Sequence, residues 1–210
     1  MVSLDQRSTM GSKTATVASR IFASLKGTWT LHRTLTSALP SFPSGTFTGS
    51  ATFTPHDPTS SSSPDVDAPQ HGLLYTESGE LITSNGLTLR ANKKYIYTYS
   101  PTDDKISAWF VKESRGGESQ TSSNSNNTAE IDYLFHELIF GGGGDNDGNN
   151  NNSYAADGRL TAAGDHLCIK DNYSARYEFD IREGEVRSWL LRYNVKGPAK
   201  DYVSETRFER

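Results

Sequence analysis

The chain of 210 residues carries a net charge of −4 and 34% hydrophobic residues, which fits one domain diluted by polar segments. It contains no lysine- or arginine-rich run, and no apolar run approaches the roughly 18 residues that a membrane helix needs. The composition therefore argues against nucleic-acid binding and against a membrane span. The single cysteine, Cys168, excludes an intrachain disulfide and is typical of a reducing compartment.

The N-terminal residues 1–16 are rich in serine and threonine, and we predict a disordered tail there. The tail lacks the apolar centre of a secretory signal, so we expect a cytoplasmic protein, with organelle targeting through the tail as the alternative. Four apolar residues then repeat at helical spacing and predict a short amphipathic helix that a Lys-Gly pair ends: Val17, Ile21, Phe22 and Leu25, before Lys26-Gly27.

After the helix, apolar and polar residues alternate in short runs, which is the pattern of half-buried strands. The runs predicted as strands are 28–35, 45–54, 73–81, 87–99, 106–112, 131–140, 163–170, 174–181, 186–196 and 201–208. We expect Gly79 to break the third run, and 87–99 to form one or two strands. The pattern predicts an all-β antiparallel sandwich or barrel, with about eight to ten strands if it is a barrel.

Three polar low-complexity segments separate some of these strands, at 55–70, 113–128 and 141–153. They hold too few apolar residues to offset the entropy of ordering, so we predict loops. The whole of 17–210 is then one β domain.

Arg33 follows Trp29 and Leu31 at every second position, so it points inward with them. A buried guanidinium needs a partner, and Glu77 is the candidate because it shares a face with Leu73 and Tyr75. Two interpretations stay open. Arg33 either packs its stem at the barrel mouth and bonds carbonyls or water, or it anchors a ligand carboxylate or carbonyl.

Two histidines also fall among inward residues. His136 lies between Leu134 and Leu138 on one face, where it is either a satisfied core residue or an acid/base group. His166 shares a face with Cys168, but residues two apart on a strand lie about 7 Å apart and pair poorly. No ligand spacing for a metal is present, and we expect neither a metal nor a cofactor.

Aromatic residues with polar tips recur on the predicted inner faces. They either fill a barrel or line a site for a planar or amphipathic small molecule. The main members are Tyr95, Tyr97, Tyr177, Trp189 and Tyr193. No glycine-rich phosphate loop lies between a strand and a helix, so nucleotide binding has no support.

The opening Leu25-Lys26-Gly27-Thr28-Trp29 resembles the start of lipocalin/calycin barrels, in which a late arginine packs across the first-strand tryptophan. Here the resemblance implies Arg207 or Arg210 in that position. A longer pattern is similar to an uncharacterised lipocalin-like family, domain of unknown function 6314, from about Phe22 onward. It comprises Gly27-x-Trp29-x-x-x-Arg33, Gly45-x-Phe47-x-Gly49-x-Ala51-x-Phe53, Tyr75-x-Glu77-x-Gly79, Phe135-His136-x-Leu138, His166-x-Cys168-x-x-Asp171-x-Tyr173-x-x-x-Tyr177 and Gly197-Pro198-x-Lys200-Asp201-Tyr202. The resemblance implies a calycin-like barrel and no particular reaction.

Three functions follow as hypotheses. The first is an intracellular protein that binds a small, partly apolar organic molecule inside the barrel. The residues that would line or guard this site are Arg33, Glu77, Tyr95, Tyr97, His136, His166, Tyr177 and Trp189. The second is an isomerase, cyclase or lyase with His136 or His166 as general acid/base. The third is an accessory partner of a larger enzyme, which exposed apolar patches would favour, although the sequence shows none clearly. The oligomeric state is left open.

Overall fold

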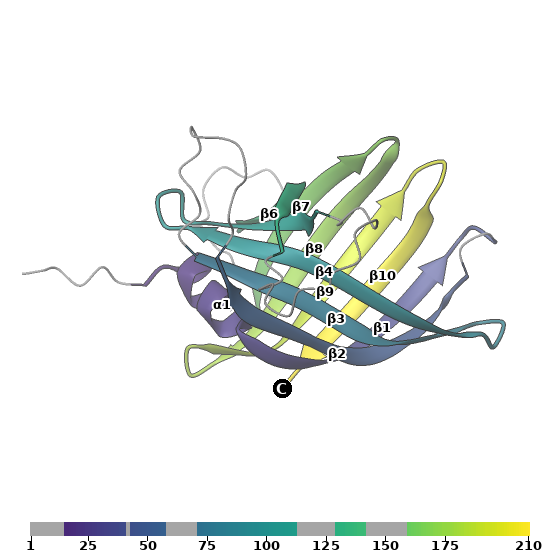
Figure 1. Ribbon diagram of the computed structural model, residues 1–210, viewed down its shortest axis with the longest axis horizontal. Coiled ribbons are helices and arrows are strands. Elements are labelled where there is room, and N and C mark those ends of the chain that lie inside the picture. Colours follow the sequence, from purple (N-terminus) through teal and green to yellow (C-terminus); the bar gives the residue numbers. More distant parts are fainter. Residues whose placement is uncertain (1–14, 41–42, 58–70, 113–128, 142–158) are drawn as a thin grey trace, which may run out of the picture.

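The computed structural model describes residues 15–40, 43–57, 71–112, 129–141 and 159–210. Over these residues the chain forms one helix and a closed antiparallel barrel of ten strands (Figure 1). The elements are α1 (Val17–Leu25), β1 (Gly27–Ser37), β2 (Gly45–His56), β3 (His71–Thr83), β4 (Thr88–Ser100), β5 (Lys105–Val111), β6 (Ile131–Phe140), β7 (Leu160–Cys168), β8 (Asp171–Arg182), β9 (Glu185–Lys196) and β10 (Asp201–Glu209). The predicted all-β, calycin-like class and the short N-terminal helix are confirmed.

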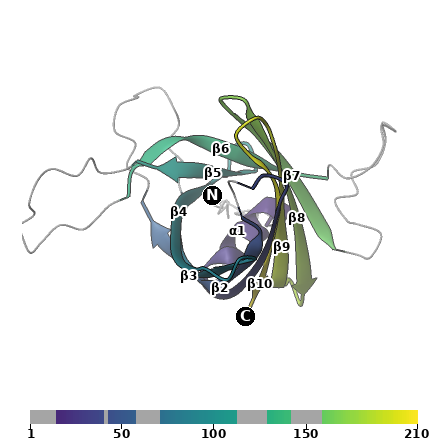
Figure 2. The same cartoon turned by 90° about the vertical axis from the view of Figure 1, so that its right-hand side faces the viewer.

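Each strand pairs with its neighbour in the sequence, and β1 closes the ring against β10. The closing ladder runs from Thr30 opposite Glu209 to Ser37 opposite Tyr202. Figure 2 looks along the barrel from one end and shows α1 lying across the far end. The ring therefore has a helix-covered end and an opposite end, called the open end below, where β1, β3, β5, β7 and β9 finish.

One detail of the predicted strands is wrong, and another is decided. The third strand is not broken at Gly79 but runs through it, and of the one or two strands expected over 87–99 the structure has one. A Cβ at position 79 would lie 2.2 Å from the Thr48 carbonyl oxygen and 2.7 Å from Phe47 Cζ. Glycine is therefore needed here for the close approach of β2, and the strand continues through it. At the edge of the loop predicted for 55–70, Pro55 and His56 belong to β2. The rest of the predicted tail and loops lies outside the described residues, apart from Ala15, Thr16, Asp57 and Gly141.

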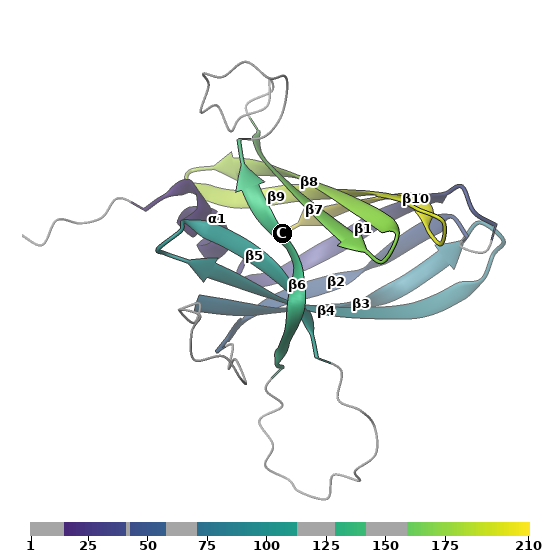
Figure 3. The same cartoon turned by 90° about the horizontal axis from the view of Figure 1, so that it is seen from above.

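The contact between β6 and β7 is the shortest in the ring. Only Ile139 with Ala163 and Phe140 with Ala162 are paired among the described residues. Figure 3 shows β6 turning away from β7 beyond this point. The ring is thus closed at this seam by two residue pairs near the covered end.

The covered end is built from the helix and the first and last strands. The apolar face of α1 (Ala18, Ile21, Phe22 and Leu25) is buried, and Thr16 caps its start by accepting a hydrogen bond from Ser19 N. Gly27 has φ of 116°, which turns the chain from the helix into β1 at little cost. Trp29 then donates its indole N–H to the Leu25 carbonyl at 2.8 Å.

Arg210 is the late arginine that the resemblance implied, and Arg207 is not. The Arg210 guanidinium lies 4.0 Å from the centre of the Trp29 ring and donates to the Ser24 and Lys26 carbonyl oxygens. It thereby satisfies carbonyls that a helix end leaves without partners. Arg207 points outward, and its nearest ion-pair partner is Glu209 at 3.9 Å.

Replacing Arg210 with alanine should therefore lower the free energy of unfolding by about 1–2 kcal/mol, since a cation–π contact and two carbonyl partners are lost. Urea denaturation measures this change. Arg207→Ala is the matched control, because it removes the same charge from the outer face and should stay within about 0.5 kcal/mol of the parent. Equal losses in the two variants would refute the assignment of Arg210.

Apolar side chains also reach the surface. Ile82, Leu87 and Leu89, at and beside the turn between β3 and β4, are 54%, 56% and 47% exposed. The sequence showed no clear patch of this kind, because Leu87 and Leu89 share the inward parity of Tyr95 and Ile82 lies just past the predicted third strand. Among the described residues, no helix has the length and apolar character to cross a bilayer.

Candidate functional site

The inward faces of the strands carry polar groups at two depths. Towards the open end lie Arg33 of β1, Glu77 of β3 and Tyr95 of β4. Deeper, where β6, β8 and β9 face β4, lie His136, Tyr177, Trp189 and Tyr97. The structure thus brings seven of the eight predicted site residues into these two groups, while His166 lies at the seam between β6 and β7.

Arg33 and Glu77 form a two-pronged ion pair, as predicted from their positions in the alternation. Arg33 Nη1 and Nη2 lie 2.6 and 2.7 Å from Glu77 Oε1 and Oε2. The side chains are only 13% and 1% exposed. Arg33 Nε donates to Thr206 Oγ1 at 2.7 Å, and the Tyr75 hydroxyl donates to Glu77 Oε2 at 2.5 Å. All three guanidinium nitrogens therefore have protein partners.

The pair stays charged. Burial alone would lower the pKa of Arg33, but the hydrogen bonds and charge of Glu77 outweigh burial and raise it. Burial alone would raise the pKa of Glu77, but the hydrogen bonds and charge of Arg33 lower it. Each group thus holds its partner ionised in a place where either charge alone would be costly.

Lys93 is a further cation at the open end. It lies directly across from Glu77 in the ladder of β3 and β4, so its side chain starts on the same inward face. Burial and, second, repulsion from Arg33 lower its pKa to about 8, against the attraction of Glu77. Lys93 is exposed, so water weakens the effect of burial on its pKa. Repulsion from Arg33 is therefore the better supported cause of the lowered pKa.

His136 belongs to a buried group of hydroxyls. Its Nε2 lies 2.7 Å from the Tyr177 hydroxyl, and the side chains of Tyr97 and Tyr193 lie near that hydroxyl. Burial and, second, the neighbouring His166 lower the pKa of His136 to about 4, so the ring is neutral at neutral pH. Burial raises the pKa of Tyr177 well above its usual value and that of Tyr97 to about 12. All of these hydroxyls therefore remain protonated and able to donate.

His136 points inward at a place in β6 where the alternation of inward and outward side chains is interrupted. The register of β5 against β6 shifts between Ala108 and Trp109, so that two consecutive residues, Phe135 and His136, are both buried. Leu134 is 37% exposed, and the prediction that it shares a face with His136 is wrong. Gly164 of β7 makes room for the ring, since a Cβ there would lie 2.5 Å from His136 Cδ2.

The three tryptophans differ in the hydrogen-bond acceptors of their indole N–H groups. Trp29 donates to the Leu25 carbonyl and Trp109 to the Thr98 hydroxyl, each at 2.8 Å. Trp189 is 3% exposed, and its Nε1 is buried with no hydrogen-bond partner among the described residues. Its ring stacks on Phe208 and Tyr177. A buried N–H without an acceptor is rare and unfavourable in a folded protein.

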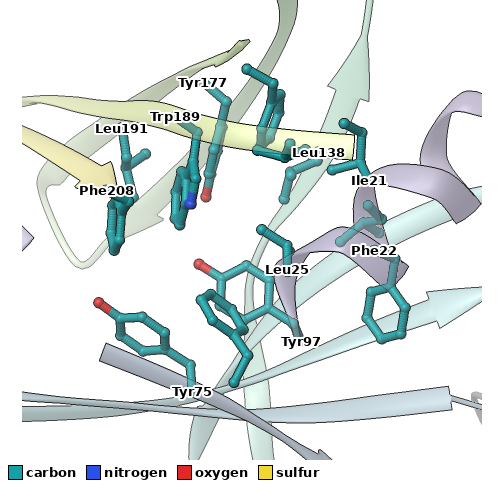
Figure 4. Packing of buried hydrophobic residues seen from close by; sticks show 14 of the residues in the cluster. Ile21, Phe22, Leu25, Tyr75, Tyr97, Leu138, Tyr177, Trp189, Leu191 and Phe208 are labelled. Atoms are coloured by element: carbon teal, nitrogen blue, oxygen red, sulfur yellow. The ribbon is translucent and has the colours of Figure 1, made fainter. Parts of the chain in front are cut away.

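Figure 4 shows how these groups face one another. Trp189 and Tyr177 extend from one wall of the barrel, while Tyr75 and Tyr97 extend from the opposite wall. The indole nitrogen and the three hydroxyl groups point into the region between the two walls. The interior thus offers several hydrogen-bond donors among aromatic rings.

His166 is half-buried at the seam. Burial lowers its pKa, while the nearby Phe135 backbone acts in the opposite direction. Its Nε2 is buried and has no partner of good geometry among the described residues. His166 packs against the rings of Phe135 and Phe110 rather than against Cys168, so no Cys/His pair is formed.

Residues 25–210 match a family described as "Family of unknown function (DUF6314)". The chain belongs to this family. A comparison with curated proteins found none that matches. Among solved structures, the S-type phycobiliprotein lyase CPES from Guillardia theta is similar, with a TM-score of 0.47 and 8% identity, covering 90% of this chain and 89% of that chain.

This DUF6314 chain also has interior residues that sequence reasoning did not include in the site. They are Tyr75, Lys93, Phe135 and Thr206. Lys93 could have been found, because it alternates with Tyr95 on its strand. Phe135 could not, since it breaks the alternation. Among the described residues, no three or more histidine, cysteine, aspartate or glutamate side chains converge in a way that could hold a metal ion.

Proposed function

We propose that the barrel interior binds a small, partly apolar organic molecule that offers a hydrogen-bond acceptor to Trp189. The observation that carries the proposal is the buried Trp189 Nε1, which has no hydrogen-bond partner within the described part of the chain, although the other two indoles have one. Apolar walls with a few directed polar groups are typical of small-molecule sites. The aromatic rings around Trp189 supply the walls, and an acceptor atom would relieve the cost of the unpaired donor.

The cluster of tyrosine hydroxyls deeper in the barrel supports the same function. Tyr97, Tyr177 and Tyr193 stay protonated, and their hydroxyls and the Trp189 N–H form a set that is rich in donors. A carbonyl, carboxylate or ether oxygen fits such a set better than an ammonium group, which can only donate. Arg33 is not needed for this contact, because Glu77 and Thr206 already engage its nitrogens.

A titration with prodan tests the proposal, since this uncharged naphthalene dye carries one ketone oxygen. We expect saturable one-to-one binding with an emission change. Trp189→Phe keeps an aromatic ring but removes the N–H, and should weaken binding about 3- to 10-fold, the worth of one hydrogen bond. Trp109→Phe removes an N–H that already has a partner on Thr98 and should leave the affinity unchanged. Absence of saturable binding, or equal effects of the two variants, would refute the proposal.

The enzyme hypothesis gains no specific support. A histidine with a pKa of about 4 holds almost no proton at neutral pH and is therefore a poor general acid. His166 Nε2 is buried, and no group in the described ranges hydrogen-bonds it and orients the ring for proton transfer. Neither residue therefore favours catalysis over binding.

A further inference from the structure

We propose that the ligand is an amphipathic acid, with its apolar body among the interior rings and its anionic group paired with Lys93 at the open end. This inference rests on the proposed function and adds the chemical class of the ligand. It follows from the charges on the inward faces of the strands.

At this part of the open end, the described residues place two cations, Arg33 and Lys93, beside one carboxylate, Glu77. Arg33 uses both oxygens of Glu77, and Tyr75 donates to one of them as well. Glu77 is therefore occupied, and no ion pair joins it to Lys93 among the described residues. The group Arg33, Glu77 and Lys93 therefore carries a net charge of about +1.

The other candidates for this role are engaged or point elsewhere. Lys200, before β10, donates to the Tyr173 hydroxyl at 2.5 Å and lies 5.3 Å from the centre of that ring. Asp171, at the start of β8, accepts from Ala199 N and is 6% exposed. Lys94 lies opposite Thr76 and points to the outer face, because neighbours on a strand alternate.

The position of Lys93 suits a head group. It lies two residues before Tyr95 on the inward face of β4, and the strand continues inward to Tyr97. Tyr95 stacks on Phe135 with the ring centres 5.6 Å apart, so an aromatic wall begins directly below the lysine. Lys93 itself keeps exposed surface. An anion there pairs with the lysine while water still reaches it, and the apolar body extends towards Trp189.

Two fluorescent dyes with the same aromatic skeleton test the inference. Anilinonaphthalene sulfonate carries a negative charge, whereas phenylnaphthylamine is neutral. We expect the wild-type protein to bind the sulfonate more tightly. Lys93→Gln should weaken sulfonate binding about 3- to 10-fold and change binding of the neutral dye less than about twofold, since a single partly solvated ion pair is lost.

Two further variants separate a local contact from general attraction. Lys94→Gln removes the same charge from the outer face and should leave both affinities unchanged, while Lys93→Arg keeps the charge and should keep the preference for the sulfonate. If Lys93→Gln has no selective effect, or Lys94→Gln matches it, the inference fails while binding of the neutral dye still supports the proposed function. If neither dye binds the wild-type protein, both fail.

Discussion

Replacing Arg33 with methionine should destabilise the protein by about 3–5 kcal/mol, because Glu77 is left as a buried carboxylate without its cation. Glu77 is 1% exposed, so water cannot take the place of the guanidinium. The loss should appear as a lower midpoint in guanidinium chloride or urea denaturation, with little change in the denaturant slope.

A second substitution tests whether the cause is the stranded charge. Adding Glu77→Gln to Arg33→Met removes the charge but keeps an amide oxygen that can accept from Tyr75, and should recover most of the stability. Arg176→Met is the control, because this guanidinium is 56% exposed on the outer face, where it pairs with Glu178, and its loss should cost less than about 0.5 kcal/mol. A loss below about 1 kcal/mol in Arg33→Met would contradict a desolvated pair.

His136 should make the folded state sensitive to mild acid. Its pKa is 6.5 as a free side chain and about 4 in the fold, so below pH 6.5 the unfolded chain takes up a proton that the folded chain refuses. The free energy of unfolding is therefore not reduced by this residue above about pH 6.5. It falls by roughly 3 kcal/mol in total as the pH drops from there to about 4.

Denaturation curves at a series of pH values between neutral and about pH 4 measure this loss. His136→Gln should show a shallower dependence than the wild type over that window, because no imidazole is left to be protonated there. His32→Gln serves as the control, since His32 is exposed on the outer face of β1 and water solvates it in both states. If His136→Gln keeps the full wild-type slope, His136 is not the group responsible.

The alternation of side chains was enough to predict the Arg33–Glu77 pair, although β2 lies between the two strands. Both residues have the inward parity of Trp29 and Tyr75, and β2 presents small inward residues at Gly49 and Ala51. Parity and size are local properties, and the sequence reports them directly. The same rule would have pointed to Lys93, which alternates with Tyr95.

The contacts of the deeper group could not be predicted in this way. His136 meets Tyr177 across β7, at a point where the register shift has moved Phe135 inward as well. Such a shift depends on the pairing of β5 with β6, which no periodicity within one strand records. The unpaired N–H of Trp189 was equally hidden, because a missing partner is a property of all the surrounding strands together.

The seam between β6 and β7 gives the cylinder a mechanical weak line. Separating any other pair of neighbouring strands would break a longer ladder. Here only two residue pairs among the described residues, Ile139 with Ala163 and Phe140 with Ala162, join β6 to β7. Separation of two neighbouring strands should therefore cost least free energy at this seam, while the remaining ladders stay intact. His136 and His166 lie on the two strands that meet there, so the amides of β6 and β7 beside the buried donors should exchange their hydrogens faster than those of the other strands.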